Sequence, residues 1–310
     1  HLTFLDDDLF YDPKESYALY NEMVRRNLGM TWDAPNGVIV SSAVTHPEIM
    51  AAAAQSGCVG MFFGIESGSA QILKEVRKPS GIKHFLQLGQ LMHQYPTIFT
   101  KGFLMIGFPG ETIRQMQETI ALAQTIGLDW YSIQIVAPLA KTEMYDQFVD
   151  LNDSDRLILR EGERQRVVER HGTGTFFKFL DADENYVPNG SEMSHIWFDI
   201  DFLINYTPLL QMTDQPRLEK AHAFLMDVCS RRVGANPVPN LFLGLVSGKL
   251  GRQQDQQQYV DRAITFLADN PYWQTRLSGL HIDVADLIGR CRSQKRLFPP
   301  HLAWDHSGSV

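Results

Sequence analysis

Three polar clusters in the first half of the chain combine residue types that could hold a small ligand. They are residues 6–8, residues 66–69 and residues 107–112, and each follows a short apolar run. Because the carboxyl ends of parallel strands meet on one face of an α/β fold, carboxylates and hydroxyls from these clusters would converge there. Any one cluster taken alone is more simply explained as a helix cap. The three together favour a ligand site.

The second and third clusters differ in the chemistry that they favour. Glu66 and Ser67 lie between glycines, where the backbone can approach a ligand and the side chains can accept hydrogen bonds from ribose hydroxyls or an amino group. A carboxylate at the centre of this loop would repel phosphate. Residues 107–110, Gly-Phe-Pro-Gly, predict a tight turn against which a flat aromatic ligand could lie, although a plain strand-to-helix turn explains them too.

The elements that would position these clusters alternate between strand-like and helix-like patterns. Strands are predicted over residues 2–5, 37–41, 59–65, 99–106 and 130–136. Helices are predicted from Pro13 with Asp12 as the cap, from Thr45 as the cap of an alanine-rich segment, over 80–93 and over 111–126. Five such units running in one direction indicate a barrel or a doubly wound parallel sheet.

The pattern changes at about residue 150. Helices are predicted over residues 150–170, 216–232, 254–267 and 271–290, with a loop-like stretch over 172–190. We therefore expect an α/β domain over residues 1–150 and a mainly helical extension over residues 151–310 that covers the barrel mouth. Trp197, Phe198 and Phe202 are candidates for a wall of the substrate pocket, and core packing explains them equally well.

The composition excludes several classes of protein. The chain has 310 residues, with 28 Lys and Arg against 36 Asp and Glu, which gives a net charge of −8. This balance argues against an electrostatic nucleic-acid binder and against an anionic lipid surface as partner. No apolar run approaches the roughly 18 residues of a membrane span. Cys58, Cys229 and Cys291 are too widely separated for a disulfide framework or a local metal site, so no metal ligands are predicted and a cytoplasmic location is expected.

Three longer segments carry a resemblance to a known family. They are residues 4–10, residues 56–69 followed by Lys74 and Lys78, and residues 101–112. In order and spacing they resemble radical S-adenosylmethionine (SAM) enzymes, and within these the cobalamin-binding class. The likeness covers about residues 1–150. It implies a partial (β/α)6 TIM-like barrel, here its second to sixth strands.

The resemblance also implies roles for residues at the strand ends. Glu66 and Ser67 would contact the ribose and the methionine end of SAM, and Asp7 and Asp8 would lie near its amino group. The residues implied to surround the adenine are Met105, Gly107, Pro109 and Val136.

Two further cofactors follow from the resemblance. Radical SAM enzymes bind a 4Fe-4S cluster through Cys-x3-Cys-x2-Cys in the loop after the first strand, where thiolates hold the cluster at low potential. This chain has no such triad, so we expect the ligands to lie upstream of His1 and residues 1–310 alone to be inactive. The implied reaction is reductive cleavage of SAM, fed by an electron donor, to a 5′-deoxyadenosyl radical that abstracts hydrogen from a substrate, which is a small molecule or of unknown class. Cobalamin would serve methyl transfer.

Two other functions remain open on the sequence. The first is a non-catalytic binding or scaffold protein on a degenerate radical SAM barrel, which the missing cysteines permit. The second is a non-radical enzyme that binds a nucleotide at the same strand ends, although the chain lacks a glycine-rich phosphate loop with a lysine. The residues encoded upstream of His1 would separate these functions from the radical one.

Overall fold

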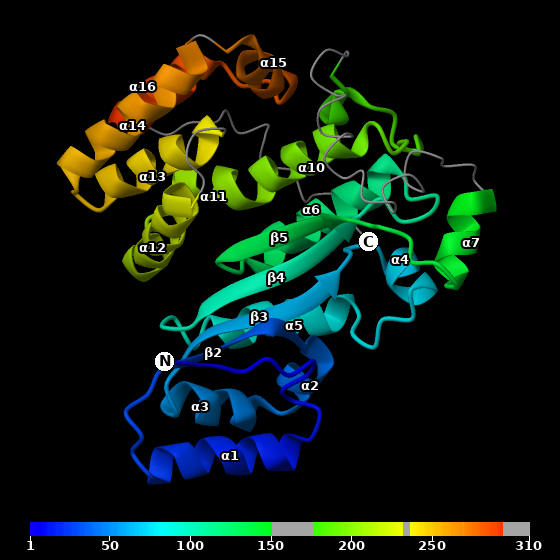
Figure 1. Cartoon of the computed structure of the whole chain (residues 1–310), viewed down its shortest axis with the longest axis vertical. Helices are drawn as coiled ribbons and strands as arrows, with labels where there is room; N and C mark the ends of the chain where they lie inside the picture. The colour runs from blue at the N-terminus through cyan, green and yellow to red at the C-terminus, as the bar shows by residue number, and fades with distance from the viewer. Residues whose placement is uncertain (151–175, 232–235, 269, 294–310) are drawn as a thin grey trace. The chain divides into compact units, whose positions relative to one another are not determined.

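The computed structural model describes residues 1–150, 176–231, 236–268 and 270–293 (Figure 1). Contacts between Cα atoms divide these residues into two compact units. The first unit holds the described residues within His1–His171 and Ala182–Ile204, and the second those within Gly172–Asp181 and Asn205–Val310. The predicted helix over residues 150–170 falls almost entirely outside the described residues.

The first unit is built on one sheet of parallel strands. The strands are β1 (Leu2–Thr3), β2 (Trp32–Ile39), β3 (Cys58–Glu66), β4 (Phe99–Ile106) and β5 (Trp130–Ile135). They lie in the order β1-β2-β3-β4-β5, so each strand pairs with its neighbour in the sequence. A doubly wound sheet would reverse its strand order at a switch point, whereas a barrel wall does not. The predicted α/β fold is confirmed, and the strand order is that of a barrel.

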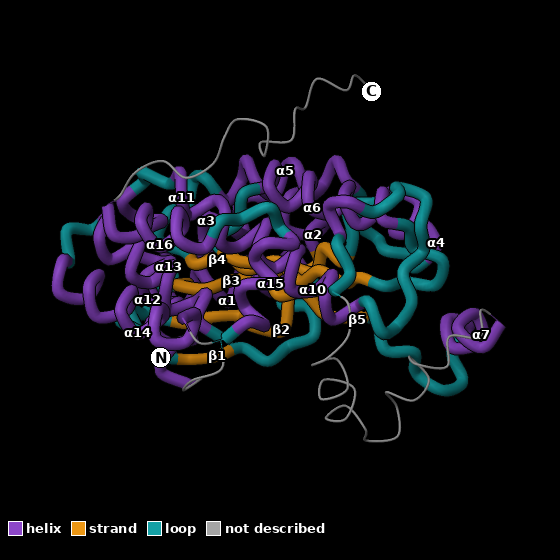
Figure 2. The backbone as a smooth tube through the Cα atoms, turned by 90° about the horizontal axis from the view of Figure 1, so that it is seen from above, coloured by secondary structure: helices purple, strands orange, loops and turns teal. Residues whose placement is uncertain are grey.

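Helices follow the strands along the chain. They are α1 (Pro13–Arg25), α2 (Val40–Thr45), α3 (Pro47–Gln55), α4 (Ala70–Glu75), α5 (Ile82–Met92), α6 (Ile113–Ile126) and α7 (Glu143–Asp150). Figure 2 shows α3, α5 and α6 along the same side of the strands. In β4, Gly102, Leu104 and Ile106 are buried, while the alternate side chains Lys101 and Phe103 are only half-buried. This period of two marks a covered face and a more open face.

One helix start confirms its predicted cap, and a second helix start has a cap that was not predicted. The Asp12 carboxylate accepts hydrogen bonds from the backbone N–H groups of Lys14 (2.9 Å) and Glu15 (3.2 Å), with Pro13 in the first helical position of α1. At the start of α6, Thr112 and Gln115 cap each other reciprocally. Each cap supplies partners for backbone groups that a helix terminus leaves without an intrahelical bond.

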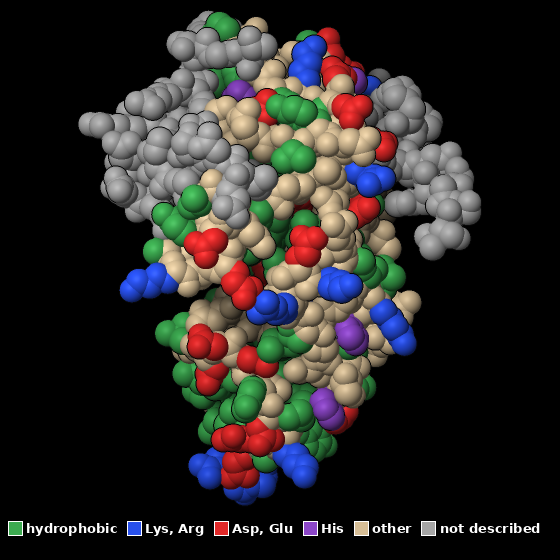
Figure 3. Space-filling view, turned by 90° about the vertical axis from the view of Figure 1, so that its right-hand side faces the viewer, with side chains coloured by type: hydrophobic (Ala, Val, Ile, Leu, Met, Phe, Trp, Pro, Cys, Tyr) green, Lys and Arg blue, Asp and Glu red, His purple; other side chains and the backbone are tan. Residues whose placement is uncertain are grey.

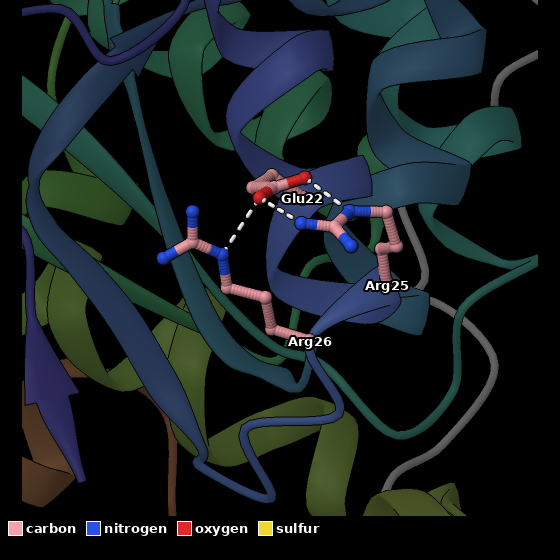
Figure 4. A network of polar contacts seen from close by, with 3 residues as sticks. All are labelled: Glu22, Arg25 and Arg26. Carbon is pink, nitrogen blue, oxygen red and sulfur yellow. Dashed lines mark hydrogen bonds and ion pairs between the residues drawn. The ribbon is translucent and has the colours of Figure 1, made fainter.

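The helix α1 ends in an exposed ion-pair network (Figure 4). The Glu22 carboxylate accepts hydrogen bonds from the Nε atoms of Arg25 and Arg26, both at 2.6 Å. These two bonds lower the pKa of Glu22 to about 2. Elsewhere on the surface, Figure 3 shows acidic and basic side chains interspersed over the visible face.

Three sequence predictions of element bounds are wrong. Thr45 ends α2 and caps nothing, because α3 begins at Pro47 with His46 before it and no side-chain cap bond. The strand β2 begins at Trp32 rather than residue 37, and its register shifts between Ala34 and Val38, so Pro35 and Gly37 hide its alternation. The predicted helix over residues 271–290 is two helices, α15 (Pro271–Gly279) and α16 (Val284–Ser293).

Aromatic packing holds α1 against β2. The ring of Tyr20 stacks on Trp32 with a centroid separation of 4.9 Å, and both side chains are fully buried. The Trp32 indole Nε1 donates a hydrogen bond to Ser56 Oγ at 3.0 Å, so its polar atom is satisfied. Burial raises the pKa of Tyr20. This core anchors the strand next to β3.

A further helix, α10 (Met193–Asp201), packs on β5 within the first unit. The Trp197 indole Nε1 donates to the Ile133 carbonyl at 2.9 Å. Phe198 and Phe202 are buried, with ring centroids 6.2 Å apart. Core packing is therefore the observed role of these two phenylalanines.

The second unit is helical, as predicted for the C-terminal part. Its helices are α11 (Thr207–Gln211), α12 (Gln215–Arg231), α13 (Pro237–Lys249), α14 (Gln253–Ala268), α15 and α16. Residues 237–248 of α13 are all buried, and α13 packs against α12, α14 and α16. A helix that is apolar all round has no amphipathic period, which is why the sequence did not predict α13. Within the described ranges, no helix combines the length and the apolar character needed to cross a membrane.

Candidate functional site

The end of β3 has a strained backbone at Glu66. Its φ is +69°, and the Ser67 N–H donates to the Ile65 carbonyl at 3.0 Å, which closes a three-residue turn around Glu66. The pairing of β3 with β4 also shifts register between Gly64 and Glu66. A γ-turn with positive φ is rare and costs energy in a residue with a side chain, and such strain is concentrated at functional sites.

The Glu66 carboxylate forms an ion pair with Lys78. The distance between Glu66 Oε1 and Lys78 Nζ is 2.9 Å, and the two side chains are 23% and 16% exposed. A Cβ at Gly64 would come within 2.9 Å of Lys78 Nζ and 3.1 Å of Glu66 Oε1, so the absence of a side chain there leaves room for the pair. A carboxylate and an ammonium thus lie side by side at a strand end, largely shielded from water.

The loop after Glu66 is fixed onto helix α6. The Gly68 N–H donates to Thr119 Oγ1 at 2.8 Å, and the hydroxyls of Ser67 and Thr119 are 3.3 Å apart. Ser67 Oγ also accepts from the Ser69 N–H at 3.0 Å, and the Ser67 side chain is fully buried. Ser67 therefore holds the loop that presents Glu66, and its contact with a ligand stays a prediction. No pattern in the sequence indicated a role for Thr119, which lies 51 residues beyond Gly68.

The turn after β4 is held by Glu111. Gly107 has a φ of +80°, and the Glu111 carboxylate accepts hydrogen bonds from the backbone N–H groups of Gly107 and Phe108. Glu111 is only 1% exposed. Glu111 was assigned no role from the sequence. It lies four residues after Gly107, the first residue beyond β4, and a carboxylate at that distance is a usable signal for a turn that it caps itself.

A cleft of about 260 Å³ opens beside Pro109. Its apolar lining is Val76, Phe108, Pro109 and Met144, and its polar lining includes Glu75, Arg77 and Glu143. Phe108 also packs in a buried cluster with Val136, and Met105 packs against that cluster. Met105 and Val136 thus share one apolar cluster with Phe108, and Pro109, the next residue along the chain, lines the cleft. These are three of the four residues implied to surround an adenine.

The two aspartates after β1 have different environments. Asp8 Oδ1 accepts from the backbone N–H groups of Phe10 (3.2 Å) and Ile39 (3.3 Å), so it ties the loop after β1 to the end of β2. Asp7 is exposed. The predicted contacts of both residues with a ligand remain predictions.

The three cysteines do not fit an iron–sulfur cluster. Cys58 lies in β3, whereas Cys229 and Cys291 lie in the second unit. Each is buried, and burial raises the pKa of Cys58 and Cys291 to about 12 and that of Cys229 to about 11. A thiolate is the form that binds metal, and these environments disfavour it. Among the described residues there is no group of three or more His, Cys, Asp or Glu side chains arranged to hold a metal ion.

Comparison with known proteins identifies relatives of the first half of the chain. The chain is 25% identical over 149 residues to the bacteriochlorophyllide d C-12(1)-methyltransferase of Chlorobaculum tepidum, a match that covers 48% of this chain and 31% of the relative. It is 28% identical over 95 residues to the tRNA-2-methylthio-N(6)-dimethylallyladenosine synthase of Deinococcus radiodurans, which covers 30% of this chain and 19% of the relative. The chain is a relative of radical SAM enzymes.

These radical SAM relatives are much longer than the matched region, which spans less than a third of either one. No family model matches the chain. A solved structure of the cobalamin-dependent SAM radical enzyme OxsB aligns with 91% of this chain and 44% of its own, with a TM-score of 0.35 and 15% identity.

Proposed function

We propose that the first unit binds SAM at the carboxyl ends of its strands, as part of a radical SAM enzyme. The observation that carries this proposal is the Glu66–Lys78 pair at the strained end of β3, in a chain related to radical SAM enzymes. In the whole protein, SAM would be cleaved reductively to a 5′-deoxyadenosyl radical that abstracts hydrogen from a small-molecule substrate.

The charges of the pair match those of the ligand. SAM carries an ammonium and a carboxylate on its methionine end and two hydroxyls on its ribose. The Glu66 carboxylate would accept hydrogen bonds from the ribose hydroxyls or the ammonium, and Lys78 would donate to the methionine carboxylate. Because the pair is largely shielded from water, each such contact is stronger than on an open surface. Ser67 would fix this loop or reach the ribose itself, and Asp7 and Asp8 would lie near the ammonium.

The adenine would lie against the turn after β4. Met105, Gly107, Pro109 and Val136 are the residues proposed to surround it, and the apolar side of the cleft at Pro109 supports this placement. The rigid hold of Glu111 on Gly107 and Phe108 keeps that surface in place.

The 4Fe-4S cluster and cobalamin would be bound by residues other than those proposed to bind SAM. A 4Fe-4S cluster supplies the electron that cleaves SAM, and an external reductant supplies it to the cluster. The described cysteines do not fit as ligands of this cluster. Cobalamin-dependent methyl transfer is the reaction that we favour. This preference is supported by the relative that is a bacteriochlorophyllide methyltransferase and by the resemblance of the sequence motifs to cobalamin-binding radical SAM enzymes.

The test is SAM affinity in the full-length protein, measured by isothermal titration calorimetry. Removing a charge-assisted hydrogen bond costs about 1.5–3 kcal/mol, so Glu66→Ala should weaken SAM binding roughly 10- to 100-fold. Glu66→Gln, which keeps the side-chain volume, should act in the same direction. Glu15→Ala on the exposed side of α1 is the matched control and should bind SAM as the wild type does. Unchanged affinity in Glu66→Ala removes Glu66 from the site.

One alternative is supported by a specific observation. The scattered, buried cysteines also suit a binding or scaffold protein that keeps the barrel without the chemistry. Full-length protein, reconstituted anaerobically with iron and sulfide and then reduced with SAM, distinguishes the two. Formation of 5′-deoxyadenosine supports the enzyme, while SAM binding without cleavage supports the scaffold. Residues 1–310 alone are expected to form no 5′-deoxyadenosine.

A further inference from the structure

The cleft beside Pro109 is lined by apolar and by polar side chains. Val76, Phe108, Pro109 and Met144 form the apolar part of the lining. Val76, Phe108 and Met144 also belong to one hydrophobic cluster or pack against it, so this part of the lining is held in place. A flat ring in the cleft would bury its faces against these side chains, while its polar edge would need hydrogen-bond partners from the rest of the lining.

Most of the polar side chains in the lining already bind a neighbour. Arg77 Nη2 donates to Glu143 Oε2 at 2.8 Å. Glu75 Oε1 accepts from Gln71 Nε2 at 2.9 Å. The Thr142 hydroxyl donates to one backbone carbonyl and accepts from one backbone N–H near the start of α7. These side chains therefore shape the walls of the cleft through contacts within the protein.

Gln147 differs from the other polar residues of the lining. Its side chain is exposed, and its amide makes no hydrogen bond with the part of the chain that the structure describes. An amide offers a donor and an acceptor side by side, whereas a guanidinium only donates and a carboxylate only accepts. Gln147 can therefore give both kinds of hydrogen bond to one ligand without losing a bond that it already makes.

The helix α7 determines where Gln147 lies. Met144, Gln147 and Phe148 are spaced by three and four residues, so they share one side of the helix. Met144 and Phe148 pack with Phe108 in the hydrophobic cluster. The side of α7 that carries Gln147 is therefore anchored next to the apolar lining of the cleft.

The cleft and the Glu66–Lys78 pair are joined by a short piece of chain. Val76 and Arg77 line the cleft, and Lys78 is the next residue. Two residues of chain span at most about 7 Å, so the Cα atoms of Val76 and Lys78 lie within that distance. A nucleoside whose ribose binds at Glu66 would thus have its base near the cleft.

We propose that Gln147 recognises the amino edge of the adenine, accepting a hydrogen bond from the 6-amino group and donating one to a neighbouring ring nitrogen. This inference rests on the proposed function, because the adenine of SAM is the base that the cleft would receive. Glutamine pairs with adenine through the same two bonds where proteins read this base in DNA. A purine without the 6-amino group would lose one of the two bonds.

The test compares adenosine with purine riboside, in which hydrogen replaces the 6-amino group, in NMR titrations of the full-length protein. One neutral hydrogen bond corresponds to about a 2- to 12-fold difference in affinity, so the ratio of the two affinities should fall by about that factor in Gln147→Leu. The ratio is the readout, because a leucine also changes the apolar contact with both ligands.

Two further variants separate recognition from a general effect on the cleft. Gln87→Leu changes an exposed glutamine of α5 and is the matched control, which should keep the wild-type ratio. Gln147→Glu retains an acceptor for the 6-amino group, so it should keep a higher ratio than Gln147→Leu. A merely structural role of Gln147 would not give this rescue. Because Gln147 is exposed, both of its variants should fold as the wild type does.

The proposal and the proposed function fail in different measurements. An unchanged ratio in Gln147→Leu overturns the proposal, and so does a wild-type protein that binds the two ligands equally or binds neither. A ratio that depends on Gln147, with no effect of Glu66→Ala on SAM affinity, would refute the proposed contacts of Glu66 and leave the adenine contact standing. A SAM affinity that depends on Glu66, with a ratio that does not depend on Gln147, would refute the adenine contact alone.

Discussion

Gly68 is the position where a single methyl group should disturb the candidate site most. A Cβ on Gly68 would lie 2.4 Å from the Glu118 carbonyl oxygen, 2.5 Å from Thr119 Cα and 2.6 Å from the Glu118 carbonyl carbon. All three atoms belong to the backbone of α6, so no side-chain rotation relieves the clash. In Gly68→Ala the loop must move away from the helix by about 1 Å to reach an ordinary contact distance.

The cost of this movement can be estimated from its parts. Forcing an extra methyl group into a packed site costs about 1–3 kcal/mol. The movement also lengthens the hydrogen bond from Gly68 N–H to Thr119 Oγ1, now 2.8 Å, which contributes about 0.5–1.5 kcal/mol. Replacing glycine by alanine also lowers the conformational entropy of the unfolded chain, which stabilises the folded protein by about 0.4–1 kcal/mol. The free energy of unfolding should therefore fall by about 0.5–4 kcal/mol.

The measurement is urea unfolding of Gly68→Ala beside Gly81→Ala. Gly81 also precedes a helix, but a Cβ there meets nothing within 4 Å. The free energy of unfolding of Gly81→Ala should therefore lie within about 0.5 kcal/mol of the wild-type value or slightly above it. Hydrogen exchange of the β3 and α6 peptides locates the change in the first unit. Because the moved loop carries Glu66, SAM affinity should fall in Gly68→Ala and not in Gly81→Ala. Equal stability of the two variants would refute the close approach of loop and helix.

Three further outcomes test other parts of the structure. Glu111→Ala removes the acceptor of two backbone N–H groups and should lower the free energy of unfolding by about 2 kcal/mol or more. The control Glu118→Ala, on the exposed side of α6, should change the free energy of unfolding little. Similar urea midpoints for the two variants would contradict the role of Glu111 in the turn. Lys249 donates hydrogen bonds to three carbonyls at the end of α11. Lys249→Met should therefore destabilise the second unit by about 1–3 kcal/mol, measured by thermal unfolding. The control Gln257→Met changes an exposed residue and should leave the stability unchanged. Burial raises the pKa of all three cysteine thiols. They should therefore not react with iodoacetamide at pH 8 in the native protein, and all three should react in urea. Rapid labelling of the native protein would show that the thiols are accessible.

Local features of the structure were predictable from the sequence where neighbouring residues decide them. Asp12 and Pro13 determine the start of α1, because the cap bonds reach only three residues along the chain. The strand β4 coincides with its predicted residues 99–106, because a regular apolar run that ends at a turn is enough to predict the bounds of a strand. The bounds of β2 were predicted wrongly, since a proline, a glycine and a register shift interrupt its alternation.

The sequence by itself determined the α/β class, the helical C-terminal part and the polar clusters that follow the strands. Only the tertiary structure decided which groups in those clusters meet. Lys78 pairs with Glu66 although the helix α4 separates them in the chain, and Thr119 binds Gly68 from 51 residues away. The two rings next to the Lys101 ammonium, Phe62 and Phe103, come from two different strands. The physical reason is that caps and periodicity depend on bonds within a few residues, whereas an ion pair or a cation on aromatic rings depends on strand register, which the packing of the entire sheet fixes.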